Sequence, residues 1–215
     1  MPPAADLWVL LPEFWLAALG LVLLGVDLVI SDRQKHVVGW VAVVGLLLAL
    51  VPTWGLVDTL QGHGRVAVFQ SYAIDGFAIF FKFIAILTTG LVILAAMDYF
   101  RAPADPRPGR LATPFEGEAY ALFVFTGLGL MLMAASADLI LLALSIEFVS
   151  LTSYVLAGYL KGHPKSNEAG LKYFLFGAAA SATMFYGFSL LYGLAGSTNL
   201  YVIAGHMKDA PPATL

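Results

Sequence analysis

Long runs of apolar residues, separated by short polar breaks, dominate the chain. Runs such as VAVVGLLLAL (41–50) and IAILTTGLVILAA (84–96) do not alternate between polar and apolar residues as barrel strands do. A helix needs about 20 mostly apolar residues to cross a bilayer. We therefore predict an all-α, polytopic transmembrane helix bundle without strands. Its six predicted spans are 7–30, 37–57, 77–97, 119–137, 139–160 and 171–195.

The polar breaks predict how the chain is organised. We predict an N-terminal three-helix segment (1–98), a charged loop (99–118), a second three-helix segment (119–200) and a terminal connection (201–215) that stops short. The first span has no Lys or Arg before it and no small-residue cleavage pattern after it. We therefore expect a retained helix and not a signal peptide.

Composition supports the membrane prediction and excludes other classes. The chain is 60% hydrophobic and only 12% charged, whereas soluble domains carry roughly 25% charged residues. These values exclude a soluble enzyme and a disordered tail, and the net charge of −3 excludes a nucleic-acid binder. Because there is no cysteine, the chain holds no disulfide, thiolate metal site or iron–sulfur cluster. The isolated histidines do not have metal-ligand spacing.

The positions of Lys and Arg predict an orientation. The first, third and fifth connections carry seven basic residues: Arg33, Lys35, Arg101, Arg107, Arg110, Lys161 and Lys165. The second connection and the C-terminal segment carry only Arg65 and Lys208. Because Lys and Arg accumulate on the cytoplasmic side, we predict that the odd connections are cytoplasmic and that both chain ends lie outside.

Glu147 is the strongest candidate for chemistry. It lies nine residues into the fifth span, in the sequence LALSIEFVSLTSY, with no charge near it. Ser150, Tyr154 and Gly158 follow at helical spacing on one face, which can hold water or a proton path. Ionisable groups inside the membrane are expensive and usually functional. The alternative is a protonated glutamate that hydrogen-bonds to a neighbouring helix.

Lys172 is the second candidate. It lies near the start of the sixth span, and its depth differs from that of Glu147 by about nine residues, or ~13 Å. This distance is too long for a direct ion pair between Lys172 and Glu147, although water can bridge the two side chains or Lys172 can contact another helix. The alternative is a lysine that extends to the interface beside Glu168, four residues earlier.

The remaining intramembrane charges have structural interpretations. For Lys82, five residues into the third span, we favour a side chain that extends to the external interface over a buried site. We expect structural roles for Glu13 and Asp27 and a helix-capping role for Asp75. Ser166 and Asn167 are equal candidates to cap the sixth span. The small residues 177–182 predict close helix packing, and Tyr72 and Tyr120 fit an aromatic belt.

The block EGEAYALFVFTGLGLMLMAASADLILLALSIEFVSLTSYVLAGY (116–159) resembles the antiporter-like membrane subunits of bacterial proton-pumping NADH–quinone oxidoreductase, respiratory complex I. The sequences LLPEFWLAALGLVLLGVD (10–27) and SNEAGLKYFLFGAAASATMFYGFSLLYGLAGSTNL (166–200) extend the resemblance, which is strongest to the subunit N family. Complete members have about fourteen helices, so 119–200 corresponds to the start of the first antiporter-like repeat. We expect a fragment or one piece of a split subunit.

The resemblance implies roles for residues and partners. It places the family's proton-pathway glutamate on Glu147 and a pathway lysine on Lys172, whereas the usual lysine partner of the glutamate lies beyond this chain. It implies a multi-pass protein of the bacterial inner membrane, in a hetero-oligomer with other membrane-arm subunits. No cofactor is expected on this chain; NADH, flavin, iron–sulfur clusters and quinone belong to partner subunits.

Two alternatives remain from sequence. One is a subunit of a multisubunit cation/proton antiporter or of a membrane-bound hydrogenase, which share the glutamate. The other is a structural membrane scaffold. Tolerance of Glu147→Leu in a working complex favours the scaffold.

Overall fold

The computed structural model describes residues 7–30, 36–60, 65–101 and 116–209, and it is almost entirely helical. Within these described residues, six helices are long and apolar enough to cross a membrane, as predicted. They are α2 (Leu11–Val29, preceded by the short helix η1, Trp8–Leu10), α3 (His36–Gly55), α4 (Gly76–Arg101), α5 (Glu116–Ala134), α6 (Leu139–Ala157) and α7 (Pro164–Ala195).

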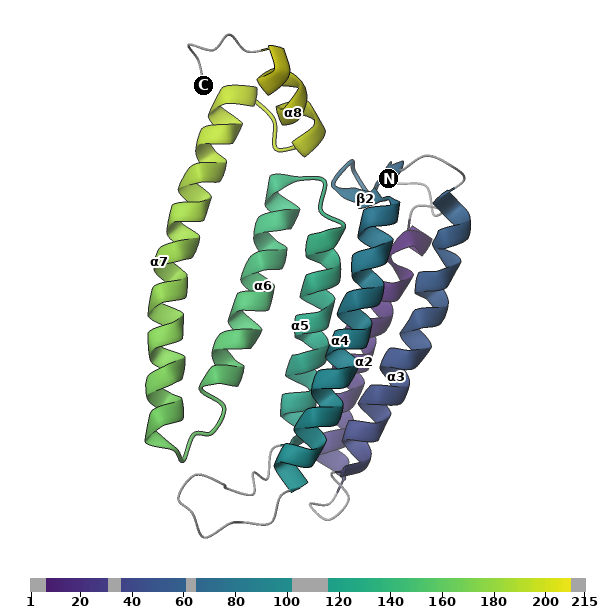
Figure 1. The fold of residues 1–215 in the computed structure, drawn as a ribbon, viewed down its shortest axis with the longest axis vertical. Coiled ribbons are helices and arrows are strands. Elements are labelled where there is room, and N and C mark those ends of the chain that lie inside the picture. Colours follow the sequence, from purple (N-terminus) through teal and green to yellow (C-terminus); the bar gives the residue numbers. More distant parts are fainter. Residues whose placement is uncertain (1–6, 31–35, 61–64, 102–115, 210–215) are drawn as a thin grey trace.

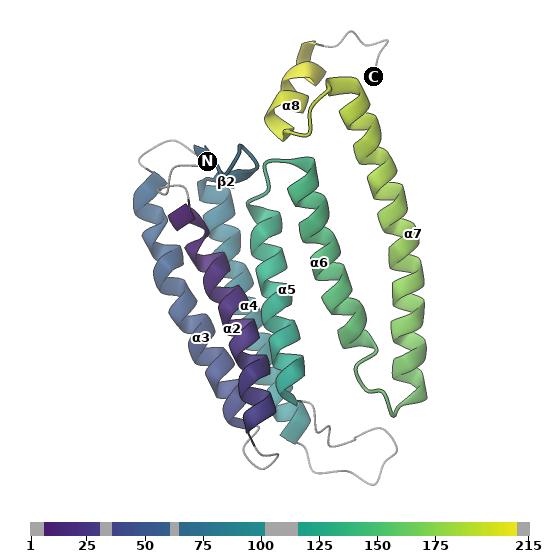
Figure 2. The same cartoon turned by 180° about the vertical axis from the view of Figure 1, so that it is seen from behind.

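The helices form a compact group of four with two more at one side (Figure 1). Helix α5 lies beside α2, α4 and α6, and α3 completes the group against α2 and α4. The core of this group consists of aliphatic side chains from all four helices, among them Leu23, Leu46, Ile93 and Val124. Viewed from behind, α7 is the outermost helix and lies beside α6 (Figure 2). None of its residues is buried.

Two short strands depart from the prediction of a strand-free fold. β1 (Arg65–Ala67) and β2 (Tyr72–Ile74) pair antiparallel, with Ala67 opposite Tyr72. Three consecutive residues at the tip, Val68, Phe69 and Gln70, have positive φ angles. The hairpin packs on a small apolar cluster that includes Val9, Ile79 and Ala135. Its end of the bundle is called the hairpin end below, and the opposite end is the loop end.

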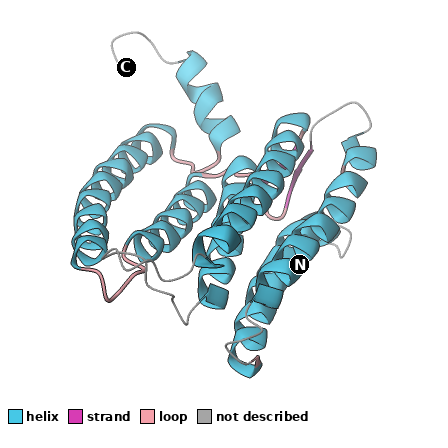
Figure 3. Ribbon diagram, turned by 60° about the horizontal axis from the view of Figure 1, so that its bottom comes forward, coloured by secondary structure: helices cyan, strands magenta, loops and turns pink. Residues whose placement is uncertain are grey.

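A short helix also occupies part of the predicted connection 201–215. Helix α8 (Leu200–Asp209) follows α7 through a turn at Gly196, whose φ of 64° is left-handed. The 3₁₀ helix η3 (Val57–Leu60) likewise lies in a predicted connection. Figure 3 shows α8 standing apart from the six long helices. The start of helix α2 and the whole of helix α8 lie at the hairpin end (Figure 1). This placement fits an even number of spans between them.

Predictions about helix starts and close packing have mixed outcomes. Asp75 accepts a hydrogen bond from the backbone N–H of Ala78 at 2.7 Å, which confirms its capping role. Helix α7 begins at Pro164, so Ser166 and Asn167 lie inside it and neither caps it. Pro favours the first helical turn because its missing N–H would have no intrahelical partner there. Most of residues 177–182 are exposed, although Gly177 lies against Tyr154 of α6.

Candidate functional site

Glu147 lies about 12 Å along α6, eight residues after its first residue. The side chain of Asp138 starts this helix by accepting a hydrogen bond from the Ile140 N–H at 2.8 Å. The Glu147 residue is half-buried, and its Oε1 atom is buried with no hydrogen-bond partner among the described residues. Because buried polar atoms are nearly always paired, this free oxygen marks a place for a proton or a water molecule.

The face of α6 that carries Glu147 turns toward α7 at its loop end. The ring of Tyr154 makes edge contacts with Tyr173 and Phe174, at centroid distances of 4.8 and 5.7 Å. Gly158 meets Gly170 so closely that a Cβ atom on Gly170 would lie 2.8 Å from the Gly158 Cα. The structure therefore places Tyr154 and Gly158, two members of the predicted stripe, between the two helices.

The Gly158–Gly170 crossing fixes which levels of the antiparallel helices correspond. Glu147 lies eleven residues before Gly158, and Ser181 lies eleven residues after Gly170. Ser181 is half-buried. It follows Gly170 and Gly177 at helical spacing, which places it on the face of α7 that is turned toward α6. The level of Glu147 along α7 is therefore that of Ser181, a small hydroxyl residue.

Lys172 lies elsewhere. Its Nζ atom is 2.5 Å from Oε1 of Glu168, and both side chains are more than 60% exposed. By the same helix register, Lys172 is nine residues, or ~13 Å, nearer the loop end than Glu147. The structure thus shows the exposed pair with Glu168 that sequence offered as the alternative. It does not bring Lys172 to Glu147.

Lys82 does not lie at the external interface that sequence favoured. Its side chain does extend from α4 toward the hairpin end, but it is only 1% exposed, so the predicted exposure at the interface is wrong. Its Nζ atom lies 2.9 Å from Oε1 of Glu13, in the first turn of α2, whose side chain is 5% exposed. The charged pair forms inside the protein because partners on two helices compensate part of the large cost of burying each charge.

Tyr72 completes this cluster. Its hydroxyl donates a hydrogen bond to Oε1 of Glu13 at 2.6 Å and accepts one from the Lys82 ammonium. Tyr72 is 1% exposed, so it is a buried bridge and not part of an aromatic belt, and Tyr120 is buried too. Burial, the Glu13 charge and the hydrogen bond to Glu13 all raise the pKa of the Tyr72 phenol, and it stays protonated. Oε2 of Glu13 is buried with no hydrogen-bond partner among the described residues.

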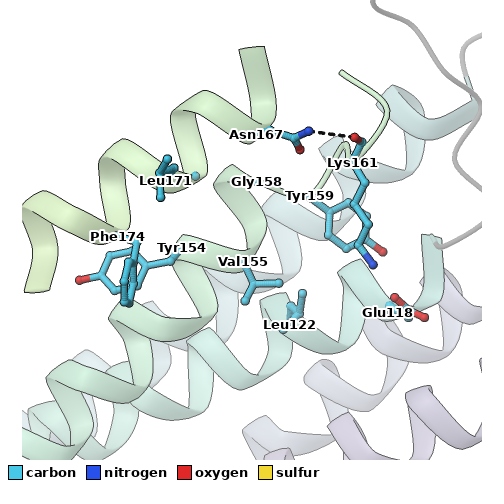
Figure 4. Close-up of a pocket in the computed structure, with 11 residues that line it drawn as sticks. Glu118, Leu122, Tyr154, Val155, Gly158, Tyr159, Lys161, Asn167, Leu171 and Phe174 are labelled. Carbon is cyan, nitrogen blue, oxygen red and sulfur yellow. Dashed lines mark hydrogen bonds between the residues drawn. The ribbon is translucent and has the colours of Figure 1, made fainter. Parts of the chain in front are cut away.

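A pocket of about 460 Å³ opens at the loop end between α5, α6 and α7. Tyr154 and Phe174 line one part of it, whereas Glu118, Tyr159 and Lys161 line another (Figure 4). The Asn167 amide holds the connecting turn by donating to the Lys161 carbonyl at 3.0 Å. The pocket thus joins a charged rim to Tyr154, which lies two helical turns, about 10 Å, from Glu147.

Acidic groups surround the rim of this pocket. Burial raises the pKa of the Tyr159 phenol, and the negative charges of Glu118 and Asp27 add to the effect. Asp27 reaches from α2 to the first turn of α5, where a Cβ atom on Gly117 would lie 2.3 Å from its Oδ1 atom. In the parts of the chain that the structure describes, no three His, Asp or Glu side chains are grouped to bind a metal ion.

Sequence comparison finds relatives over most of the chain. A family described as NADH:quinone oxidoreductase/Mrp antiporter, TM, matches residues 136–211. NADH-quinone oxidoreductase subunit N 2 of Chloroherpeton thalassium is 39% identical over 199 residues, which cover 92% of this chain and 37% of that protein. Subunit N of Trichlorobacter lovleyi is 37% identical over 93% of this chain and 38% of its own length. The chain therefore spans about two fifths of the curated relatives.

Solved structures share the fold. Respiratory complex I from Thermus thermophilus with bound aureothin contains a chain that matches 91% of this one with a TM-score of 0.64 and 27% identity, over 42% of its own length. A chain of the archaeal membrane-bound sulfane sulfur reductase matches 94% of this one with a TM-score of 0.65, and at 22% identity it supports the fold alone. Over nine tenths of its length, this chain is thus similar to curated proteins named NADH-quinone oxidoreductase subunit N, and its residues 136–211 match the family described as NADH:quinone oxidoreductase/Mrp antiporter, TM.

Proposed function

We propose that the chain works in the membrane arm of a proton-translocating NADH–quinone oxidoreductase. The names of its relatives and the fold shared with a complex I chain support this proposal. The chain would do no redox chemistry; NADH, flavin, iron–sulfur clusters and quinone would belong to partner subunits. Its place would be the bacterial inner membrane, with the odd connections on the cytoplasmic side.

The free, buried Oε1 atom of Glu147 is the observation on which the mechanism rests. A nearby positive charge keeps a buried carboxylate ionised, and removal of that charge raises its affinity for a proton. Electron transfer elsewhere in the complex would move such a charge, so that Glu147 alternately binds and releases a proton. Water in the pocket between α5, α6 and α7 would supply that proton from the loop end.

Lys172 has a secondary role in this proposal. Its pair with Glu168 lies beside the loop end of α7, one residue beyond Leu171 of the pocket lining. We infer that Lys172 adjusts the charge near the pocket and does not contact Glu147. Lys172→Gln should therefore lower proton translocation less than Glu147→Gln does.

The test replaces Glu147 by Gln in the intact complex and compares NADH oxidation with proton translocation in sealed membranes. Gln has nearly the same shape but carries no ionisable proton, so we expect translocation per NADH to fall. Asp58→Asn, which neutralises an exposed acid in η3, is the matched control and should change neither rate. Full translocation at normal turnover in Glu147→Gln would refute the role of Glu147.

A cation/proton antiporter subunit is the second candidate, because the matching family description covers both classes. It uses the same intramembrane acid but needs no electron transfer. Sodium-dependent proton exchange without NADH, abolished by Glu147→Gln, would favour it.

A further inference from the structure

Glu13, Tyr72 and Lys82 form a polar cluster that the proposed function does not use. The three residues come from α2, β2 and α4, and each is less than 5% exposed. Lys82 lies six residues after the first residue of α4, and Glu13 lies in the first turn of α2. The cluster therefore lies within the apolar bundle near its hairpin end, while Glu147 lies deeper on α6.

The chemistry of the cluster differs from that of a structural ion pair in one respect. Oε1 of Glu13 lies 2.9 Å from the Lys82 Nζ atom and accepts a hydrogen bond from Tyr72 at 2.6 Å, whereas Oε2 is buried with no hydrogen-bond partner among the described residues. A structural ion pair would be expected to satisfy both carboxylate oxygens, since an unpaired buried acceptor is costly. The free oxygen leaves room for a proton on Glu13.

We propose that Glu13, Tyr72 and Lys82 form a second proton-transfer site, which passes protons between the bundle interior and the hairpin end. The proposal rests on the proposed function. In the transfer step, the N–H bond of the Lys82 ammonium breaks and an O–H bond forms on Glu13, which leaves a neutral amine and a neutral carboxylic acid. Glu13 then releases its proton to water at the hairpin end, and the Lys82 amine takes up another from the interior. One proton has moved, and the ion pair is restored.

The hairpin connects this site to the helix that carries Glu147. The Ala73 N–H donates to the Ala135 carbonyl at 2.7 Å, and the Ala137 N–H donates to the Ser71 carbonyl at 2.8 Å. These bonds flank Tyr72 and hold it to the turn from which α6 begins. A displacement of α6 during turnover therefore shifts the Tyr72 hydroxyl relative to Glu13 and Lys82.

Lys82→Arg separates proton transfer from structure. Arginine keeps the positive charge opposite Glu13, but its guanidinium does not lose a proton in proteins. In the intact complex we expect normal assembly and at least ~10-fold less proton translocation per NADH, because a positioned proton-transfer group typically contributes a factor of ~10²–10⁴. Translocation at the level of the unmodified complex in an assembled Lys82→Arg variant would overturn the proposal.

If the arginine side chain does not fit the buried site of Lys82, the double variant Glu13→Gln/Lys82→Met tests the proton-transfer role instead. It removes both charges together, so neither is left buried alone, whereas either single change leaves one uncompensated. We expect assembly to fail more in the single variants than in the double variant, and translocation to be lost in the assembled double variant. An assembled double variant that translocates normally would overturn the proposal.

Glu147→Gln, measured in parallel, distinguishes failure of this proposal from failure of the proposed function. If Glu147→Gln loses translocation while the assembled Lys82 and double variants retain it, only the second site is wrong. If Glu147→Gln translocates normally and Lys82→Arg does not, the second site stands and the role of Glu147 is wrong. If all three translocate normally, both proposals are wrong.

Discussion

Replacement of Gly170 by Ala should weaken the packing of α7 on α6, because these helices touch backbone to backbone at this point. A Cβ atom on Gly170 would lie 2.8 Å from the Gly158 Cα and 3.1 Å from its nitrogen, while ordinary contacts begin at 3.4 Å. Neither atom belongs to a side chain that can rotate away, so the helices must separate by about 0.6 Å to reach 3.4 Å. Overpacking of this kind costs about 1–3 kcal/mol.

Gly193→Ala in the same helix is the matched control, because nothing lies within 4 Å of the added Cβ atom. Both substitutions gain helix propensity, up to about 1 kcal/mol, so their difference isolates the packing cost. Thermal unfolding of the purified protein in detergent should give Gly170→Ala a Tm lower than that of Gly193→Ala, by about 2–4 °C per kcal/mol. Equal Tm values would refute the close helix crossing.

Two further predictions concern the hairpin end and the buried phenols. Asp138→Ala removes the cap of α6 and the hydrogen bond that Asp138 accepts from Thr198, so it should destabilise the protein by about 1–2 kcal/mol in thermal unfolding. Asp138→Asn should retain most of the stability. Equal Tm values for the two variants would contradict this prediction. In an alkaline absorbance titration of the folded protein near pH 10, where free tyrosine ionises, Tyr72→Phe and Tyr159→Phe should keep the full amplitude, because their raised pKa values keep both phenols protonated. A reduced amplitude in Tyr72→Phe would show an accessible phenol.

The six long helices could be predicted from sequence because a membrane span is a local property of about 20 residues. Their ends were less predictable where polar residues continue the helix. The polar sequence KSNE follows Pro164 and extends α7 seven residues before the predicted start at residue 171. Strands β1 and β2 have three residues each, too few for a reliable alternating pattern.

The position of Glu147 on the same face of α6 as Tyr154 and Gly158 followed from helical spacing alone. The contact between Glu13 and Lys82 did not, because the two residues are 69 positions apart and no local pattern links them. A usable signal was nevertheless present. With both chain ends on one side, the first and third spans start at the same face of the membrane, and each carries one charge of opposite sign near that start. Matched depth and opposite charge predict a pair.

Lys172 shows the opposite limit. Its sequence spacing from Glu168 offered an i, i+4 ion pair as the alternative to a pathway role, and this pair is the contact that the structure has. A role in proton transfer depends on the resemblance and on partners outside this chain, so geometry within the chain does not predict it.

The central claim is that Glu147 gains and loses a proton during turnover. Infrared difference spectra of the intact complex, recorded with and without NADH oxidation, detect the C=O stretch of a protonated carboxyl group directly. We predict a carboxyl band that disappears in Glu147→Gln and persists in the Asp58→Asn control. A band that remains unchanged in Glu147→Gln, or the absence of any carboxyl band during turnover, would contradict the account.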